Sequence, residues 1–157
     1  MKKKKAYVAN VTLTVANPRH FRAFPHAKGD AYTRCKVALS PRTGRVEMGP
    51  DNHHTIHQCR RGPVVFKVRV SPKGVYHPTG VAFEHTKAPR GVKRLKHPAV
   101  RDNFPVEKVV IRDGVLEFTD KCNSNTAGMS FEYYVFIQRK DGALGVIDPG
   151  IKHDPAG

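Results

Sequence analysis

The sequence lacks the features that mark a membrane protein or a secreted, disulfide-rich protein. Its three cysteines, Cys35, Cys59 and Cys122, leave one unpaired in any pairing and have no regular spacing, which argues against a disulfide framework. No apolar run approaches the roughly 20 residues needed to span a bilayer. The lysines at 2–5 precede a segment that alternates with Asn and Thr, unlike the continuous apolar core of a signal peptide. We therefore predict a cytoplasmic protein with reduced thiols and no membrane span.

The common catalytic motifs are also missing. The chain contains no P-loop, no GxGxxG, no HExxH and no GxSxG. A thiol–imidazole pair stays open as an alternative, either Cys59 with His57 or Cys122 with a distant histidine, but nothing indicates a base held by a third group. The aspartates nearest to such a role stand beside turns or prolines, where Asp usually accepts backbone hydrogen bonds: Asp120, Asp148 and Asp154. We predict that the protein is not an enzyme.

Acidic residues are scarce, and the excess of positive charge is the most unusual global property. The chain has 28 Lys and Arg against 13 Asp and Glu, a net charge of +15 and a pI near 10.1. A field of this sign attracts polyanions, although a basic surface without a dedicated ligand is the alternative. Basic residues concentrate in an N-terminal arm and in the stretch 86–105, where Asp102 is the only acidic residue. The predicted polyanion-binding residues are Lys2, Lys3, Lys4, Lys5, Lys87, Arg90, Lys93, Arg94, Lys96 and Arg101.

Nucleic acid is the polyanion that we expect, although no recognition motif is present. The chain has no helix-turn-helix, RNP or KH sequence, so any specificity has to come from shape. Phe21 and Phe24 stand among arginines and histidines in the segment 17–30. They either pin this loop to the core, which is the commoner outcome, or stack on bases together with Tyr32.

Short strands separated by Pro and Gly dominate the pattern. The clearest strand places Phe131, Tyr133, Val135 and Ile137 on one face, and the dipeptide at 141–142 forms a hairpin turn after it. Further strands are predicted at 6–15, 31–39, 45–48, 64–70, 75–76, 81–83, 106–111 and 115–118. The pattern predicts an all-β fold, a single antiparallel β-sandwich of eight or nine strands with Greek-key connections. It spans residues 6–157, follows a basic arm at 1–5, and carries a long basic loop at 86–105.

A histidine-rich segment offers a candidate metal site. If residues 54–59 are extended, His57 and Cys59 share one face, His54 points to the other, and His53 comes from the preceding turn. Imidazole and thiolate are ligands for zinc or copper. The spacing matches no standard zinc finger, so solvated histidines in a loop are the alternative. We predict no obligatory cofactor.

The C-terminal third resembles a known group of proteins. Leu116-Glu-Phe-Thr-Asp120, Tyr133-Tyr-Val135, Asp141-Gly142 and Ile147-Asp-Pro-Gly-Ile151 are similar to the ending of small bacterial cupredoxin-like β-sandwich proteins of the DP-EP type. The resemblance implies a cupredoxin-like fold and no particular activity. A type-1 copper site needs two His, a Cys and an axial Met, with a His close to the Cys and the Met. Cys122 and Met129 have no His between them, so this chain departs from that pattern.

Three hypotheses follow in order of preference. The first is a non-enzymatic β-sandwich that binds a polyanion, with nucleic acid as the expected partner, through the arm and the 86–105 loop. The second is an assembly subunit whose basic arm faces nucleic acid. The third is a metal-binding cupredoxin-like protein that uses His53, His54, His57 and Cys59.

Overall fold

The fold consists of two β-sheets, seen in a computed structural model that describes residues 5–23, 32–49, 52–87, 97–123, 126 and 128–154. The first sheet has the order β2-β1-β5-β8-β7. Its strands are β1 (Tyr7–Thr14), β2 (Lys36–Ser40), β5 (Val64–Ser71), β7 (Val110–Arg112) and β8 (Val115–Asp120). The second sheet has the order β10-β9-β11-β4-β3, and β6 also pairs with β9. Its strands are β3 (Val46–Met48), β4 (His53–Ile56), β6 (Tyr76–Lys87), β9 (Ser130–Arg139), β10 (Leu144–Ile147) and β11 (Gly150–His153).

Both sheets are mixed, so the expectation of wholly antiparallel pairing is wrong. β1 runs parallel to β5, and β11 runs parallel to β4, whereas the other pairs are antiparallel. Parallel neighbours need a long crossover between them. The chain makes that crossover from β1 to β5 by passing through β2 in the same sheet and through β3 and β4 in the other. The expectation of a mainly β protein is confirmed, with more strands than the eight or nine predicted.

One hydrophobic core fills the space between the sheets. Phe131, Tyr133, Val135 and Ile137 of β9 have no exposed surface, as the period of two in the sequence predicts. Phe66 of the first sheet stacks on Phe118 with ring centroids 5.0 Å apart, and its centroid lies 6.5 Å from that of Tyr133 in the second. Burying such a side chain contributes about 1.5–3 kcal/mol each. The core is therefore what fixes the two sheets relative to each other.

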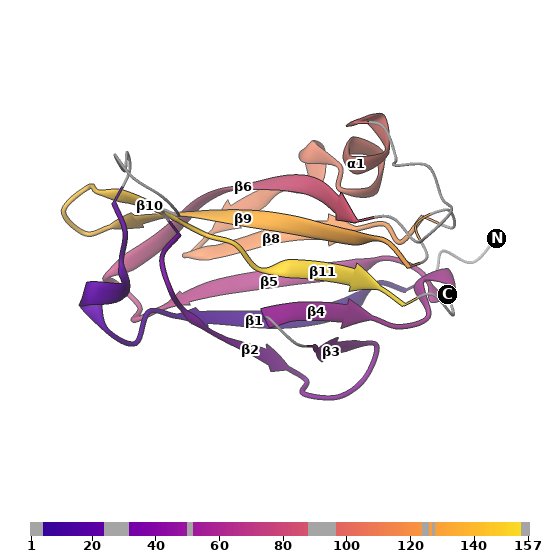
Figure 1. The fold of residues 1–157 in the computed structure, drawn as a ribbon, viewed down its shortest axis with the longest axis horizontal. Helices are drawn as coiled ribbons and strands as arrows, with labels where there is room; N and C mark the ends of the chain where they lie inside the picture. The colour runs from indigo at the N-terminus through magenta and orange to yellow at the C-terminus, as the bar shows by residue number, and fades with distance from the viewer. Residues whose placement is uncertain are drawn as a thin grey trace.

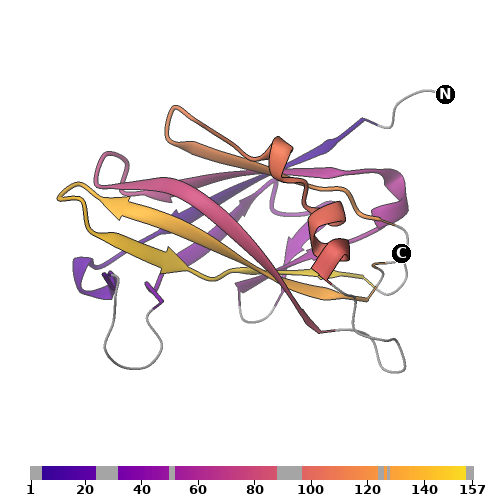
Figure 2. The ribbon, with the colours of Figure 1, turned by 90° about the horizontal axis from the view of Figure 1, so that it is seen from above.

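The stretch that the sequence predicts as one basic loop contains regular structure at both ends. β6 continues to Lys87, and α1 (His97–Asn103) lies beside β6, followed by the 3-10 turn η4 (Val106–Lys108) (Figure 2). Pro98 stands in the first turn of α1, where a missing N–H costs no helical hydrogen bond. Just after α1, Phe104 is buried and stacks on Phe83 of β6 with centroids 4.4 Å apart. This aromatic contact fastens α1 to the edge strand.

The long strands run between two ends of the molecule (Figure 1). One end holds the 3-10 turn η1 (Pro18–His20), the start of β2, the β5–β6 turn and the β9–β10 turn. The other end holds the 3-10 turn η3 (Cys59–Arg61), the segment after β8 and the end of β11.

The described part of the chain contains no helix long and apolar enough to cross a bilayer.

Candidate functional site

Cationic side chains from four chain segments meet at the first of these ends, which we call the basic end. Backbone hydrogen bonds join the segments: Arg34 N–H donates to His20 O (3.2 Å), and Lys140 N–H donates to Val75 O (2.9 Å). In the described residues of these segments, Asp141 is the only acidic one. The basic end consists of Arg19, Arg22, Arg34, Lys36, Lys73, Arg139 and Lys140, all exposed except the half-exposed Arg139.

Phe21 anchors the loop that carries two of these arginines. It is buried, and its ring stacks on Tyr76 with centroids 5.5 Å apart. The guanidinium of Arg139 lies 4.6 Å from the Phe21 centroid and makes two hydrogen bonds to the carboxylate of Asp141, at 2.9 and 2.7 Å. These bonds from Arg139 hold the pKa of Asp141 at about 2. The pinning interpretation of Phe21 is confirmed, whereas Phe24 lies outside the described residues.

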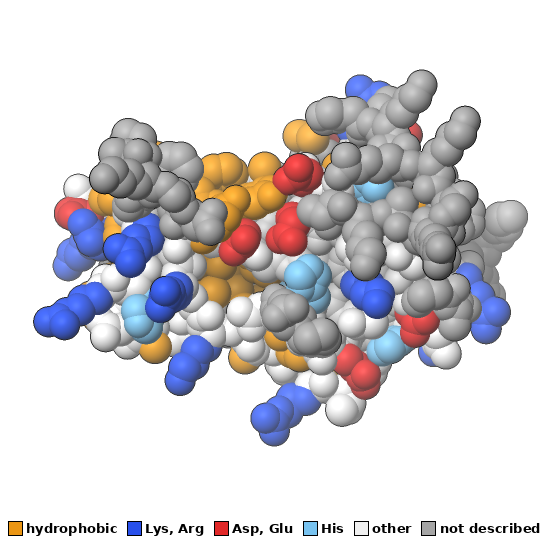
Figure 3. Space-filling view, in the orientation of Figure 1, with side chains coloured by type: hydrophobic (Ala, Val, Ile, Leu, Met, Phe, Trp, Pro, Cys, Tyr) orange, Lys and Arg blue, Asp and Glu red, His pale blue; other side chains and the backbone are white. Residues whose placement is uncertain are grey.

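The surface charge is uneven on the face shown in Figure 3. Lys and Arg side chains gather toward the basic end, while carboxylates lie nearer the centre of this face (Figure 3). The outward side of the second sheet carries Glu84 on β6 and Glu132 on β9, which lie opposite each other in the paired strands. Tyr134, two residues after Glu132 on β9, donates its hydroxyl to Glu84 Oε2 at 2.6 Å. This face is therefore divided into a cationic end and an acidic centre.

Of the ten predicted polyanion-binding residues, the three in the described part of the chain lie on separate segments. Lys2, Lys3, Lys4, Arg90, Lys93, Arg94 and Lys96 lie outside the described residues. Lys5 is exposed just before β1, Arg101 is exposed on α1, and Lys87 is the last residue of β6. The prediction for the arm and the loop stays a prediction. The basic end was missed because its residues are scattered in sequence and become neighbours only through strand pairing.

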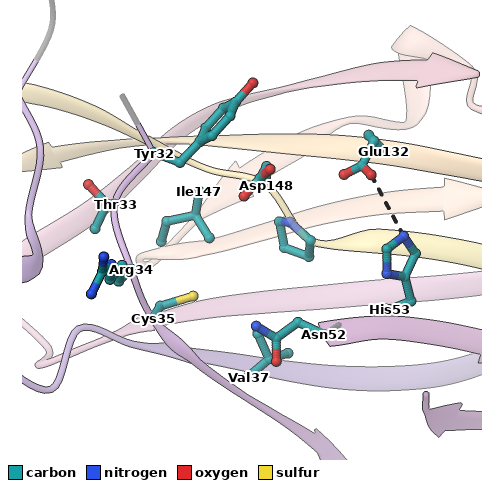
Figure 4. A pocket seen from close by; sticks show the side chains of 11 residues that line it. Tyr32, Thr33, Arg34, Cys35, Val37, Asn52, His53, Glu132, Ile147 and Asp148 are labelled. Atoms are coloured by element: carbon teal, nitrogen blue, oxygen red, sulfur yellow. Dashed lines mark ion pairs between the residues drawn. The ribbon is translucent and has the colours of Figure 1, made fainter. Parts of the chain in front are cut away.

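The four predicted metal ligands also separate, because β4 directs alternate side chains to opposite sides of its sheet. His53 lies on the outer side, 3.7 Å from Glu132 (Figure 4), and lines a surface pocket of about 520 Å³. His54 is fully buried beside Phe66 and Tyr133, and burial lowers its pKa to about 3.

His57 turns toward carboxylates instead of a shared metal position. Its Nδ1 lies 2.8 Å from Asp154 Oδ2, and its Nε2 lies 3.2 Å from Glu47 Oε2. These hydrogen bonds, with Asp154 the stronger, raise the pKa of His57. Of the four predicted ligands, Cys59 alone belongs to a group of metal-capable atoms in the described chain.

That group joins Cys59 to two residues that are far away in sequence, and we call it the cysteine cluster. Cys59 opens η3, Cys122 follows β8 by two residues, and His153 ends β11. The two sulfur atoms and one ring nitrogen of His153 all lie within 4.8 Å of one another. All three side chains are buried, with exposures of 5%, 6% and 0%. The sequence presents Cys59 and Cys122 as separate thiols and carries no signal for His153.

A buried polar network holds the cysteine cluster. Asp120 Oδ2 lies 2.6 Å from His153 Nε2, and Asp120 Oδ1 accepts from the backbone N–H of Cys122 (2.8 Å) and from Asn103 Nδ2 (2.7 Å). The other ring nitrogen of His153 lies 2.8 Å from Thr126 Oγ1. Asp120 therefore orients the imidazole and fixes the backbone of Cys122 at the same time.

The network also sets the protonation of the cluster. Burial lowers the pKa of His153, but the Asp120 carboxylate outweighs burial and raises it to about 10. The hydrogen bond from Cys122 is the largest cause that brings the pKa of Cys59 down to about 6, while the same bond and burial raise that of Cys122. Cys35 behaves differently, because burial and the nearby Asp148 raise its pKa to about 12. The cluster thus contains one thiol that ionises readily.

Comparison with known proteins adds no relative to this picture. No protein-family model matches the chain, and no curated protein is significantly similar to it.

Proposed function

We propose that the protein binds nucleic acid through the basic end and catalyses no reaction. The single observation that carries the proposal is the convergence of seven cationic side chains from four separate segments, with Asp141 as the only acidic residue in the described parts of those segments. Such a surface neutralises several phosphates at once and releases their counterions. Binding through the arm at 1–5 and the 86–105 loop extends the same proposal.

Two features favour nucleic acid over other polyanions. Four of the seven residues are arginines, whose planar guanidinium suits bidentate contacts to phosphate oxygens. Tyr32 precedes Thr33 and Arg34, is 39% exposed and stacks on Tyr134 with centroids 6.0 Å apart. The Tyr32 ring lies between Arg34 of the basic end and the acidic centre that contains Tyr134, and an exposed ring there offers a stacking surface for an unpaired base. We therefore expect single strands to bind more tightly than duplexes of the same charge.

Three variants with equal change in net charge test which surface is responsible. The first reverses Arg22, Arg34 and Lys140 at the basic end. The second reverses Lys93, Arg94 and Lys96 in the predicted loop. The matched control reverses Arg61, Lys108 and Lys152, which are exposed on η3, η4 and β11. Each replacement is by Glu, so net charge falls equally in all three.

Fluorescence anisotropy with a labelled single-stranded DNA, measured from low to moderate salt, separates the outcomes. We expect the basic-end variant to lose the most affinity, because its direct ion pairs with phosphate disappear while the overall attraction also weakens. For this variant the slope of log K against log salt should become shallower by up to about 2, at roughly 0.7 for each single-strand phosphate that is no longer neutralised. Equal reductions in affinity in all three variants would mean that net charge alone drives binding. If the protein binds heparin more tightly than it binds DNA, the basic end is a site for acidic polysaccharide and not for nucleic acid.

The same proposal includes a fold type. We infer that the two mixed sheets form a Greek-key β-sandwich of the cupredoxin-like kind. The observation in support is the single core shared by both sheets, together with the resemblance of the β9–β11 region to DP-EP proteins. An experimental structure in which the strand order differs from that of cupredoxins would end this inference.

A further inference from the structure

We propose that Cys59, Cys122 and His153 form a binding site for one thiophilic metal ion, Cu(I) or Zn(II). The site lies at the end of the molecule opposite the basic end and shares no residue with it. The inference is therefore independent of nucleic-acid binding, and either one can fail alone.

The spacing of the ligand atoms suits an ion at their centre. Metal–sulfur bonds of about 2.3 Å and metal–nitrogen bonds of about 2.0 Å place tetrahedral ligand atoms roughly 3.5–3.8 Å apart. The two sulfurs and one of the two imidazole nitrogens already lie within 4.8 Å of one another. Each pair therefore needs to close by little more than about 1 Å at most. Rotation of the cysteine side chains covers such a distance without moving a strand.

The kind of donor selects the kind of metal. Two thiolates and one imidazole are soft and borderline ligands, which favour Cu(I) and Zn(II) over the oxygen-preferring Mg²⁺ and Ca²⁺. Burial of all three residues keeps larger partners away from the sulfurs, so a small ion fits this place better than a protein thiol or an organic substrate does. Three protein ligands satisfy a trigonal Cu(I) ion, whereas Zn(II) needs a fourth ligand.

Asp120 stands where metal sites place a supporting carboxylate. A histidine ligand almost always donates its other ring N–H to a carboxylate, a carbonyl or a water. His153 Nε2 has this contact to Asp120, so Nδ1 is the nitrogen that we assign to the metal. Binding through Nδ1 replaces one hydrogen bond to Thr126 Oγ1, which keeps its own bond to Asn123 O at 2.6 Å. Binding through Nε2 would cost more, because the buried Asp120 would lose its imidazole partner.

The backbone around both cysteines is held in unusual conformations. Cys122 has a φ of 52°, and Gln58, immediately before Cys59, has a φ of 53°. Such left-handed conformations are uncommon for residues other than Gly and often occur at functional sites. The N–H of Cys122 is fixed by Asp120 in this conformation. The backbone that positions both sulfurs is thus held in conformations that cost free energy.

Metal titration of the full chain without an affinity tag, reduced and under anaerobic conditions, tests the proposal. Cu(I) and Zn(II) are each added in competition with a chromophoric chelator, and Co(II) is added as a spectroscopic probe. We expect one ion per chain, a thiolate-to-Co(II) charge-transfer band, and X-ray absorption that shows two sulfur neighbours. The coordination number found by X-ray absorption distinguishes a trigonal Cu(I) site from a four-coordinate Zn(II) site. Failure of all three ions to bind stoichiometrically overturns the site.

Cysteine variants locate the ion. Cys59→Ser and Cys122→Ser should each weaken binding at least about 100-fold and remove charge-transfer intensity, since each deletes a ligand. The matched control Cys35→Ser, which changes the half-buried cysteine outside the cluster, should bind as the natural chain does. Full affinity in either cluster variant overturns the assignment.

Asp120→Asn tests Asp120 as a positioning residue. We expect affinity to fall about 10–100-fold, together with a shift of the charge-transfer band that loss of fold alone would not produce. If the serine variants do not fold, alkylation of the natural chain decides, at a urea concentration at which local opening exposes the buried thiols. Bound metal should protect Cys59 and Cys122 while leaving the reactivity of Cys35 unchanged. Protection of none of them, or a Cys59–Cys122 disulfide in a protein whose reduced form binds no metal, would contradict the proposal.

Discussion

The basic end and the cysteine cluster are assembled in the same way, but the charges of the first are exposed to water and the polar atoms of the second are buried. Each joins segments that are distant in sequence through strand pairing. At the basic end, like charges remain in water, where their repulsion is weak and screened by salt. In the cysteine cluster every polar atom is buried and needs a partner, because an unpaired buried charge is costly. Substitutions at the basic end should therefore change binding, and those in the cluster should change stability as well.

The largest effect should come from Asp120→Ala. The change leaves buried His153 without its carboxylate, and it leaves Asn103 Nδ2 and the Cys122 N–H without an acceptor. Breaking a buried ion pair in this way costs about 3–5 kcal/mol of the free energy of unfolding. Urea denaturation at neutral pH measures the loss.

Asp141→Ala is the matched control, because Asp141 also bonds to a cation but is exposed at the basic end. We expect no measurable loss of stability from it, since exposed pairs contribute little. Equal destabilisation by Asp120→Ala and Asp141→Ala would remove the contrast between the two ends.

Buried His54 should make the protein sensitive to acid. Its folded pKa of about 3 lies below the ordinary value of 6.5, so the unfolded state binds more protons below pH 6.5. The contribution of His54 to stability should fall as the pH drops from about 6.5 to about 3. Within this range the contribution of His54 to the free energy of unfolding decreases by about 1.4 kcal/mol for each pH unit, and below it the contribution stays constant.

His54→Gln cannot titrate and retains a group that can hydrogen bond to the Tyr133 hydroxyl, which lies 2.5 Å from His54 Nε2. Its free energy of unfolding, measured by urea denaturation from pH 7 to 4, should decline less steeply than that of the natural chain. His77→Gln changes an exposed histidine and should follow the natural chain. Parallel curves for all three proteins would show that His54 is not the acid-sensitive group.

Tyr32→Ala tests whether exposed rings at the basic end add to binding. Loss of a stacked base should weaken the affinity for single-stranded DNA by about 1–3 kcal/mol and leave duplex binding almost unchanged. Because Tyr32 is 39% exposed, thermal stability should change little. Anisotropy titrations with both DNA forms measure the difference. Equal weakening for both forms would indicate a change in surface charge geometry instead of stacking.

Local patterns predicted most of the strands, because a period of two and turn residues act over a few positions. They missed β4 and β11, and residues 106–108, predicted as strand, form the 3-10 turn η4. The buried face of β9 and the β9–β10 turn follow directly from Phe131 to Ile137 and from Asp141-Gly142. Pairing between distant strands carries no such local signal. The parallel pairing of β11 with β4 brings His153 opposite Ile56 and thus near Cys59. No spacing pattern in the sequence indicates that Cys59 and His153 are neighbours.

The predicted histidine set failed for a related reason. It treated residues 53–59 as a site complete in itself, whereas each side chain there finds its partner elsewhere in the chain. His54 meets Tyr133, His57 meets Asp154, and Cys59 meets Cys122. Ligands at neighbouring positions of a strand alternate between opposite sides, so a compact cluster in sequence is dispersed in space. The basic end shows the converse, since residues from 19 to 140 come together.

The smallest effect, and the sharpest test of the basic end, is the influence of Asp141→Ala on binding. Asp141 holds the Arg139 guanidinium through two hydrogen bonds and is the only acidic residue in the described parts of the four segments. Its removal frees Arg139 for phosphate while Phe21 still supports the guanidinium from below. The affinity for single-stranded DNA should rise, and log K should become more dependent on log salt by about 0.7, equivalent to one more neutralised phosphate. Asp102→Ala on α1 removes the same charge away from the basic end, so equal increases in both variants would mean that Arg139 takes no direct part in binding.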